Sequence, residues 1–336
     1  MATKKSTIYD LATLAQTSPS TVSAILNGTW QQRRISAQTA LRVQALAQKQ
    51  KYSLNRQASG LRTSRSGLIG MIIPTHEDHF FGMMSQSFDR MARERRQQPI
   101  VASTLRDPAL EIETVKTLIS YQVDSLVVTG ASDPDGVSRV CRHHQVMHVN
   151  VDLPGKRAPS VISDNHWGAA QLTATLIARS RPQPTPARDR LYFLGGVTAD
   201  HATQRRIQGF VDTVTPVFGP VEASQIQACG YEAAAAEAEL RALYARIGGL
   251  PRALLMAASL SLEGAIRFLR ELPDEELQAC AFGSYDWHPY AAFLRCPVHM
   301  MRQDVDGLLD AAFKLIGGAR GSSRPVEIRP QLMLGD

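Results

Sequence analysis

Apolar residues in the first 50 positions recur at helical spacing in three short segments. The three apolar sets are Ile8, Leu11, Ala12 and Ala15; then Val22, Ile25 and Leu26; then Ala40, Val43, Leu46 and Ala47. Spacings of three and four residues place each set on one face of a helix. Two or three residues separate the first two segments, which is helix-turn-helix spacing. We therefore predict a small all-α head over residues 1–51, of the kind that reads the major groove of DNA.

Polar residues mark where these helices begin. Thr7 is the predicted N-cap of the first helix, and Asp10 is placed to reach back to it. The second helix is expected to begin near Ser18, because Pro19 is well tolerated in a first turn. The side of this helix away from its apolar set carries hydroxyls. We expect phosphate or base contacts from Ser18, Ser20, Thr21 and Ser23.

From residue 67 onward the pattern changes to short apolar runs that alternate with longer amphipathic segments. A first series contains GLIGMIIP, VDSLVVTG and QVMHVNVD, and a second contains RLYFLGG, ALLMAAS, LQACAFGS and PVHMMRQ. Strands that alternate with helices form doubly wound parallel sheets. The pattern predicts a two-lobed α/β core over residues 67–336, joined to the head by a hinge over residues 52–66.

Charge separates the head from the core. Residues 1–65 contain ten basic residues and one acid, a net charge of +9. The whole chain carries +6, so the remaining 271 residues carry −3. A basic head on a mildly acidic core indicates a polyanionic partner, double-stranded DNA, for the head alone.

No motif for catalysis or metal binding stands out. The four cysteines form no Cys-x-x-Cys pair, and THEDH at residues 75–79 lacks the helical spacing of a zinc protease. A phosphate-binding loop and a nucleophile elbow are also missing. We therefore expect no metal, no cofactor and no enzymatic activity. The N-terminus has no apolar export segment, so we expect a cytoplasmic protein without a membrane partner.

The segment TIYDLATLAQTSPSTVSAILNG, residues 7–28, carries a longer pattern. It resembles the N-terminus of the LacI family of transcription regulators, T-I-x-D-V-A-x-x-A-G-V-S-x-x-T-V-S-x-x-L-N. Gln16 and Thr17 replace the Gly-Val that is usual in the turn. The resemblance implies base contacts at Pro19, Ser20 and Ala24, and none of these side chains can make a bidentate base contact.

The segment between the second and third helices, TWQQRRIS, looks about three residues longer than is usual in that family. It brings in Trp30, Arg33 and Arg34. One interpretation is that the two arginines add contacts to phosphates or bases. The other is a solvated loop with Trp30 packed on the core of the head.

The hinge resembles the family pattern Y-x-P-N-x-x-A-x-x-L, with Leu54 in place of the proline. The resemblance implies that this segment becomes helical when two chains meet on an operator. Leu61 would then insert between base pairs of the minor groove, with Arg56 and Arg62 beside phosphates. A flexible linker is the alternative.

The core resembles the remainder of the same family, whose two lobes are like those of periplasmic sugar-binding proteins. SVISDN, RRIQGF, FGSYDW and MRQD carry the likeness. The resemblance implies that an effector binds between the lobes. The residues that it assigns to the effector are Phe80, Phe81, Asp164, Arg206, Asp286 and Trp287. Asp164 could instead cap a helix, Trp287 could be part of a lobe core, and Ser259 departs from the usual Asp or Asn.

Taken together, the resemblance implies a homodimeric DNA-binding regulator, a repressor, whose operator affinity is controlled by a small effector. A monosaccharide or sugar alcohol is the expected effector, ahead of a phosphosugar or a purine. Two other classes stay open at this point. They are a sugar-processing enzyme with a basic tail and a sugar-binding module for transport.

Overall fold

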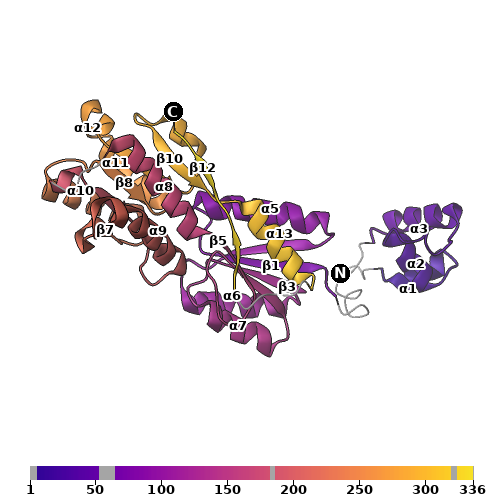
Figure 1. Ribbon diagram of the computed structural model, residues 1–336. Coiled ribbons are helices and arrows are strands. Elements are labelled where there is room, and N and C mark those ends of the chain that lie inside the picture. The colour runs from indigo at the N-terminus through magenta and orange to yellow at the C-terminus, as the bar shows by residue number, and fades with distance from the viewer. Residues whose placement is uncertain (1–5, 53–64, 182–185, 319–323, 336) are drawn as a thin grey trace. The chain divides into compact units, whose positions relative to one another are not determined.

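The computed structural model describes residues 6–52, 65–181, 186–318 and 324–335. The chain forms two compact units, residues 1–66 and residues 67–336 (Figure 1). We call them the head and the core, and describe each by itself.

The head contains three helices, as predicted. They are α1 (Ile8–Leu14), α2 (Pro19–Leu26) and α3 (Ala37–Lys49). Thr7 and Asp10 form a capping box at α1, and Ser18 caps α2 by accepting a hydrogen bond from the Thr21 amide at 3.1 Å. The apolar faces predicted from the sequence meet in one small core, with Trp30 packed against it.

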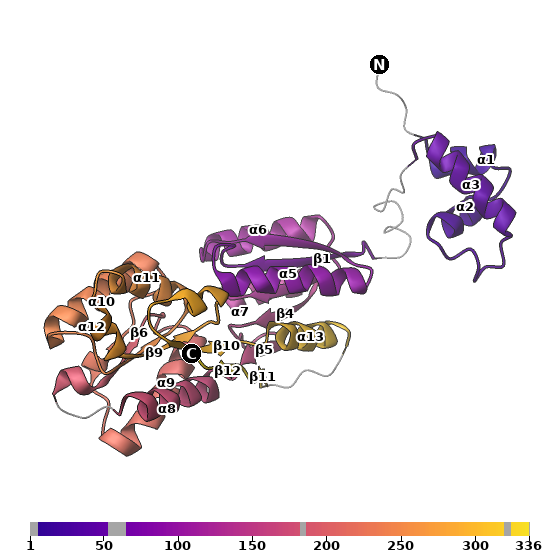
Figure 2. The same cartoon turned by 90° about the horizontal axis from the view of Figure 1, so that it is seen from above.

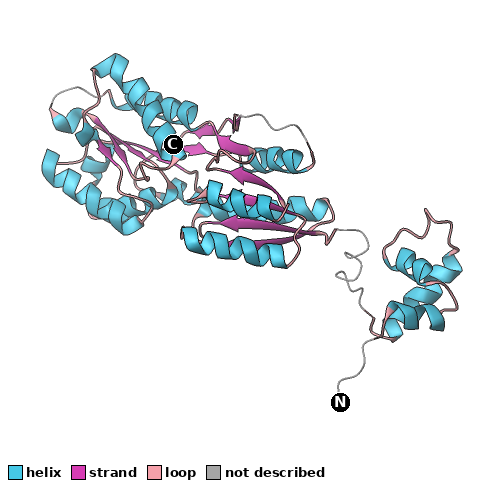
Figure 3. Ribbon diagram, turned by 90° about the horizontal axis from the view of Figure 1, so that it is seen from below, coloured by secondary structure: helices cyan, strands magenta, loops and turns pink. Residues whose placement is uncertain are grey.

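The first lobe of the core is a six-stranded sheet with the order β11-β5-β4-β3-β1-β2, and all its pairs are parallel. Its strands are β1 (Leu68–Ile73), β2 (Gln98–Ser103), β3 (Ser125–Thr129), β4 (Met147–Val151), β5 (Ser160–Ser163) and β11 (Val326–Ile328). Its helices are α5 (His79–Glu94), α6 (Pro108–Ser120), α7 (Pro134–His143) and α13 (Val305–Ile316). α5 and α13 pack on one face of this sheet, and α6 and α7 pack on the other (Figure 1). Figure 3 shows the helices in cyan and the strands in magenta.

The second lobe has a six-stranded sheet of order β12-β10-β9-β8-β6-β7, in which β12 runs antiparallel to β10. Its strands are β6 (Leu191–Leu194), β7 (Ile226–Gln227), β8 (Ala253–Met256), β9 (Ala281–Tyr285), β10 (Val298–Arg302) and β12 (Gln331–Met333). Its α-helices are α8 (Asn165–Ser180), α9 (His201–Phe218), α10 (Ala233–Ile247), α11 (Ser259–Leu269) and α12 (Asp274–Gln278). Short 3₁₀ turns are η1 (Ala187–Asp189), η2 (Ala223–Gln225) and η3 (Pro289–Phe293).

The chain passes between the lobes at three places. It crosses after β5 into α8, returns after β10 into α13, and crosses again between β11 and β12. Helix α13, drawn in yellow, therefore lies against the first lobe although it follows the second-lobe strands in sequence (Figures 1 and 2). Residues beside these crossings can respond when the angle between the lobes changes.

The prediction of two doubly wound lobes is confirmed, and the strands β2, β11 and β12, which it did not include, escape the sequence pattern for two different reasons. Strand β2 begins Gln-Pro and is half-buried along its whole length, so it lacks the apolar run of a central strand. Strands β11 and β12 contain three residues each, too few for a period to show. Within the described ranges, no helix combines the length and apolar character that a membrane crossing needs.

Candidate effector cleft and nucleic-acid interface

A cleft lies where side chains from both lobes meet, at the carboxyl ends of the parallel strands. Its side chains enclose a free volume of about 30 Å³, and the cleft opens to solvent. Its polar lining consists of Asp78, Arg106, Asp152, Arg206, Asp286 and Gln303, and its aromatic lining of Phe80, Phe81 and Tyr231. Ligands of doubly wound folds bind at this edge of the sheet because loops there combine free side chains with a rigid base.

Arg206 of α9 is the most constrained cation in the cleft. Its side chain is 4 % exposed, and Nε donates to Asn165 Oδ1 at 2.8 Å while Nη1 donates to the Ala257 carbonyl at 2.5 Å. The guanidinium also lies 3.9 Å from the ring centroid of Tyr285. These contacts fix the direction in which the group faces a ligand.

Three buried carboxylates line the same cleft as this arginine. Asp78 caps α5, Asp152 follows β4, and Asp286 follows β9. Burial raises the pKa of Asp286 to about 7, with Asp78 and Asp152 adding to the shift and Arg206 opposing it. Burial likewise raises the pKa of Asp152 to about 6. Carboxylates that are buried together can accept hydrogen bonds from neutral hydroxyls without adding further charge.

Gln303 adds an amide beside the second lobe crossing. Its Nε2 donates to Asp286 Oδ1 at 2.5 Å. Its Oε1 is buried and has no hydrogen-bond partner within the part of the chain that the structure describes. A buried acceptor without a partner favours a ligand hydroxyl at this position.

Four of the six residues that the sequence assigned to the effector line this one cleft. Phe80 and Phe81 form its apolar wall, and Arg206 and Asp286 form part of its polar side. The two rings meet edge to face, with centroids 5.0 Å apart. A flat apolar wall opposite a polar side suits a molecule with C–H and hydroxyl groups on different faces.

The other two residues occupy structural positions outside the lining. Asp164 caps α8, where its carboxylate accepts a hydrogen bond from the Trp167 amide at 3.0 Å. Trp287 packs against the core of the second lobe, and its ring lies 5.0 Å from the Arg302 guanidinium. For both residues the structure gives the alternative that the sequence left open.

Several lining residues were not singled out from the sequence. Asp78 and Asp152 follow strands β1 and β4, and their positions at strand ends are the signal that could have found them. Gln303 lies in the MRQD segment that carries part of the family likeness. Arg106 and Tyr231 come from loops on different lobes, and no sequence pattern joins them.

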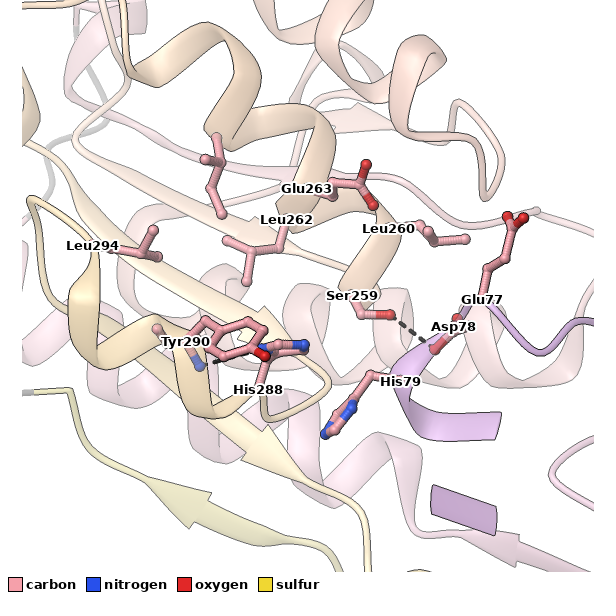
Figure 4. Close-up of a pocket in the computed structure, with 12 residues that line it drawn as sticks. Glu77, Asp78, His79, Ser259, Leu260, Leu262, Glu263, His288, Tyr290 and Leu294 are labelled. Atoms are coloured by element: carbon pink, nitrogen blue, oxygen red, sulfur yellow. Dashed lines mark hydrogen bonds between the residues drawn. The ribbon is translucent and has the colours of Figure 1, made fainter. Parts of the chain in front are cut away.

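A second pocket lies beside the cleft and shares Asp78 with it (Figure 4). Ser259, at the start of α11 in the second lobe, donates a hydrogen bond to Asp78 Oδ1 at 3.0 Å. Ser259 therefore contacts a lining residue of the first lobe. His79 of the THEDH segment also faces this pocket. Among the described residues, no group of three or more His, Cys, Asp or Glu could hold a metal ion.

In the head, the polar end of α2 is exposed and its middle is not. Ser18 and Ser20 are exposed, and their hydroxyl oxygens lie 2.7 Å apart. Pro19 and Thr21 are half-buried. Ser23 and Ala24 are only 7 % and 4 % exposed. This corrects the expectation of a DNA-facing surface over the whole length of the helix.

The long segment after α2 is tied down at both ends. The Thr29 amide donates to the Ala24 carbonyl at 2.9 Å, and the Ile35 amide donates to the Trp30 carbonyl at 3.0 Å. Trp30 packs on the head core, while Arg33 and Arg34 are exposed. Arg56 and Leu61 of the hinge lie outside the described residues.

Comparison with known proteins places this architecture in a family. Residues 7–55 match the family model for bacterial regulatory proteins of the lacI family. Residues 66–272 match the model for periplasmic binding proteins and the sugar-binding domain of the LacI family. The chain belongs to the LacI family. It is a DNA-binding transcription regulator, and this membership decides against the enzyme and transport-module alternatives.

Two curated relatives show how near the likeness is. The chain is 51 % identical over 196 residues to the ribitol operon repressor of Klebsiella aerogenes, covering 57 % of this chain and 71 % of that protein. It is 29 % identical over 288 residues to the sucrose operon repressor of Klebsiella pneumoniae, covering 85 % and 84 %.

Solved structures share the fold. The lac repressor dimer bound to operator and the anti-inducer ONPF superposes with a TM-score of 0.79 at 20 % identity, covering 99 % of both chains. The Cra regulator of Pseudomonas putida in complex with fructose 1-phosphate superposes with a TM-score of 0.71 at 21 % identity, covering 80 % of this chain and 99 % of that one.

Proposed function

We propose that this protein is a repressor whose affinity for operator DNA is controlled by a pentitol, or a closely similar uncharged polyol, bound between the lobes. The observation that carries the proposal is the composition of the cleft. Asp78, Asp152, Asp286 and Gln303 offer acceptors to several hydroxyls, and Phe81 offers an apolar wall. The 51 % identity to a ribitol operon repressor supports an open-chain polyol.

Charge favours a neutral ligand over a phosphosugar. The cleft is lined by three carboxylates and by only two guanidinium groups, those of Arg106 and Arg206. Arg206 is already engaged by two acceptors of the protein. A phosphate placed here would meet Asp78, Asp152 and Asp286 in a largely desolvated site, where like charges repel strongly.

DNA binding is assigned to the head. At the start of α2, Ser18 and Ser20 are exposed and Pro19 and Thr21 are half-buried, and the next segment supplies the exposed Arg33 and Arg34. We assign phosphate contacts to the arginines and groove contacts to the helix. Arg56 and Leu61 of the hinge complete the proposed interface. Because these helix residues cannot make bidentate base contacts, DNA shape contributes much of the specificity.

Two chains are proposed to pair through their cores, which places two heads on a two-fold related operator in the cytoplasm. A ligand in the cleft contacts both lobes and therefore alters the angle between them. That change reaches the hinge through the first lobe, whose strand β1 begins two residues after the last residue of the head unit. Release of DNA is then a coupling free energy of about 1–3 kcal/mol.

Titration calorimetry of the purified chain tests the ligand class. The panel holds ribitol, D-arabitol, xylitol, sorbitol, ribose, fructose 1-phosphate and a purine base. We expect binding of one or more pentitols, weaker binding of sorbitol, and none of the phosphosugar. Binding of fructose 1-phosphate in preference to every pentitol would contradict the proposal.

A further inference from the structure

One side chain of the cleft lies between aromatic rings of the two lobes. Arg106 belongs to the first lobe, in the loop between β2 and α6. Its Cζ lies 4.3 Å from the ring centroid of Tyr231, which belongs to the second lobe, and 5.6 Å from that of Phe81. Guanidinium groups are attracted to aromatic faces at such distances, more strongly when water is excluded.

The loop that presents Arg106 is held in an unusual conformation. Leu105 and Arg106 have φ angles of 54° and 58°, in the left-handed region that residues with a Cβ rarely adopt. The Leu105 amide donates to the Pro74 carbonyl at 2.7 Å, and Ser132 Oγ donates to the Arg106 carbonyl at 3.2 Å. These bonds fix the loop to the end of β1 and to the segment before α7, so the side chain leaves the first lobe in a defined direction.

Tyr231 is fixed to the second lobe in a similar way. Its hydroxyl and Thr203 Oγ1 lie 3.0 Å apart, and the same Thr203 oxygen accepts a hydrogen bond from the Val197 amide at 3.1 Å. The residue before it, Gly230, forms an isolated bridge with Gly196. The Arg106 guanidinium and the Tyr231 ring are therefore both held by their own lobes, and their contact joins the lobes directly.

We propose that Arg106 is a strap residue that holds the cleft closed through Tyr231 and so sets the affinity for the effector. Separation of the lobes removes the ring of Tyr231 from the guanidinium while Phe81 stays beside it. The cation also lies near Asp152 of the same lobe, one of the proposed ligand acceptors. The claim that Arg106 holds the cleft closed stands on these contacts alone. The claim that it sets the effector affinity rests on the proposed polyol function.

The test measures the distance between the lobes in the full chain without ligand. Spin labels are placed on Lys116→Cys in α6 and Ala238→Cys in α10, two exposed positions on different lobes, and the half-buried Cys229 is replaced by Ser. The distance distribution is then recorded by pulsed electron resonance for the labelled parent and for strap variants.

We expect Arg106→Ala and Tyr231→Leu each to shift the population toward longer distances, and the double variant to add little. Arg106→Lys should fall between, because an ammonium keeps the charge but loses the planar stacking. Leu105→Ala is the matched control, since that side chain is 71 % exposed in the same loop and at a similar φ. Equal distributions for the parent and Arg106→Ala would overturn the strap.

Calorimetry with ribitol then separates the two proposals. If the strap is correct, Arg106→Ala weakens ribitol binding at least tenfold, whereas Leu105→Ala leaves it within twofold. The parent could bind no polyol while Arg106→Ala still shifts the distance between the lobes. That outcome would support the closure by Arg106 and contradict the proposed ligand. A parent that binds ribitol as tightly as Arg106→Ala does rejects the affinity part of the strap.

Discussion

The amide nitrogen of Gln303 donates to the Asp286 carboxylate at 2.5 Å, which links a lobe crossing to the effector cleft. Gln303 lies between the last residue of β10 in the second lobe and the first turn of α13 in the first. Its other amide atom, the buried Oε1, has no hydrogen-bond partner in the described part of the chain. A ligand hydroxyl that donates to this oxygen would touch the segment that connects the lobes.

Removal of this amide should therefore weaken effector binding more than it destabilises the fold. Gln303→Ala removes one acceptor for the ligand and one donor to Asp286, and each net hydrogen bond contributes about 0.5–1.5 kcal/mol. We expect roughly tenfold weaker ribitol binding by calorimetry. Gln204→Ala is the control, because Gln204 bonds the Thr198 carbonyl on an exposed surface of the second lobe. Equal affinities for the two variants would argue against the role of Gln303.

Effector binding should depend on pH near neutrality. Burial raises the pKa of Asp286 to about 7 and that of Asp152 to about 6 in the folded chain. A ligand hydroxyl that donates to these groups favours their ionised forms, so affinity is highest above pH 7. It should fall as pH drops through 7 and fall more steeply below 6.

Calorimetry with ribitol between pH 5.5 and pH 8.5 measures this dependence, and Asp286→Asn should remove the step near pH 7. Affinity that is independent of pH over this range would show that the two carboxylates do not accept hydrogen bonds from the ligand.

The exposed arginines after α2 should determine part of the salt dependence of DNA binding. Each phosphate that a protein neutralises contributes about −0.9 to the slope of log K against log salt. Arg33→Ala and Arg34→Ala should each reduce the steepness by about that amount. Fluorescence anisotropy at several salt concentrations measures the slopes. Lys116→Ala, an exposed site in the core, serves as the control. Unchanged slopes in both arginine variants would favour a solvated loop.

The turn between α1 and α2 should gain stability from a glycine. Gln16 has φ 49°, and a residue with a Cβ loses about 1–2 kcal/mol in the left-handed region. Glycine relieves this strain but costs about 0.5–1 kcal/mol in backbone entropy. Gln16→Gly should therefore stabilise the head by about 0.5–1 kcal/mol.

Hydrogen exchange of the α1 and α2 amides in the full chain measures this change as slower exchange. Ala45→Gly, at an exposed position inside α3, should destabilise the head and speed the exchange, because glycine is a poorer helix former than alanine. Faster exchange in Gln16→Gly would mean that the left-handed turn carries no strain.

The sequence was most informative where local rules decide the structure. Caps at Thr7 and Ser18 follow from short-range hydrogen bonds, and the apolar runs of the core correspond to strands because parallel sheets are buried on both faces. The burial of Ser23 and Ala24 was harder to predict, because helix periodicity does not show how closely other parts of the head cover α2.

The cleft was predictable only where the family likeness supplied the positions. Arg206 and Asp286 were found in this way. Arg106 and Tyr231 are 125 positions apart and meet through the arrangement of the lobes, which no local pattern encodes. Asp164 and Trp287 have side chains suited to a sugar, yet the structure places one in a helix cap and the other against a lobe core.

The most direct test of this account is whether a polyol changes operator affinity. A DNA duplex selected by the full chain from a random library is titrated with protein in fluorescence anisotropy, with and without saturating ribitol. We predict that ribitol weakens binding by about 5- to 150-fold, the range of typical allosteric coupling, and that fructose 1-phosphate has no effect. An operator affinity that is the same with and without every pentitol would contradict the account.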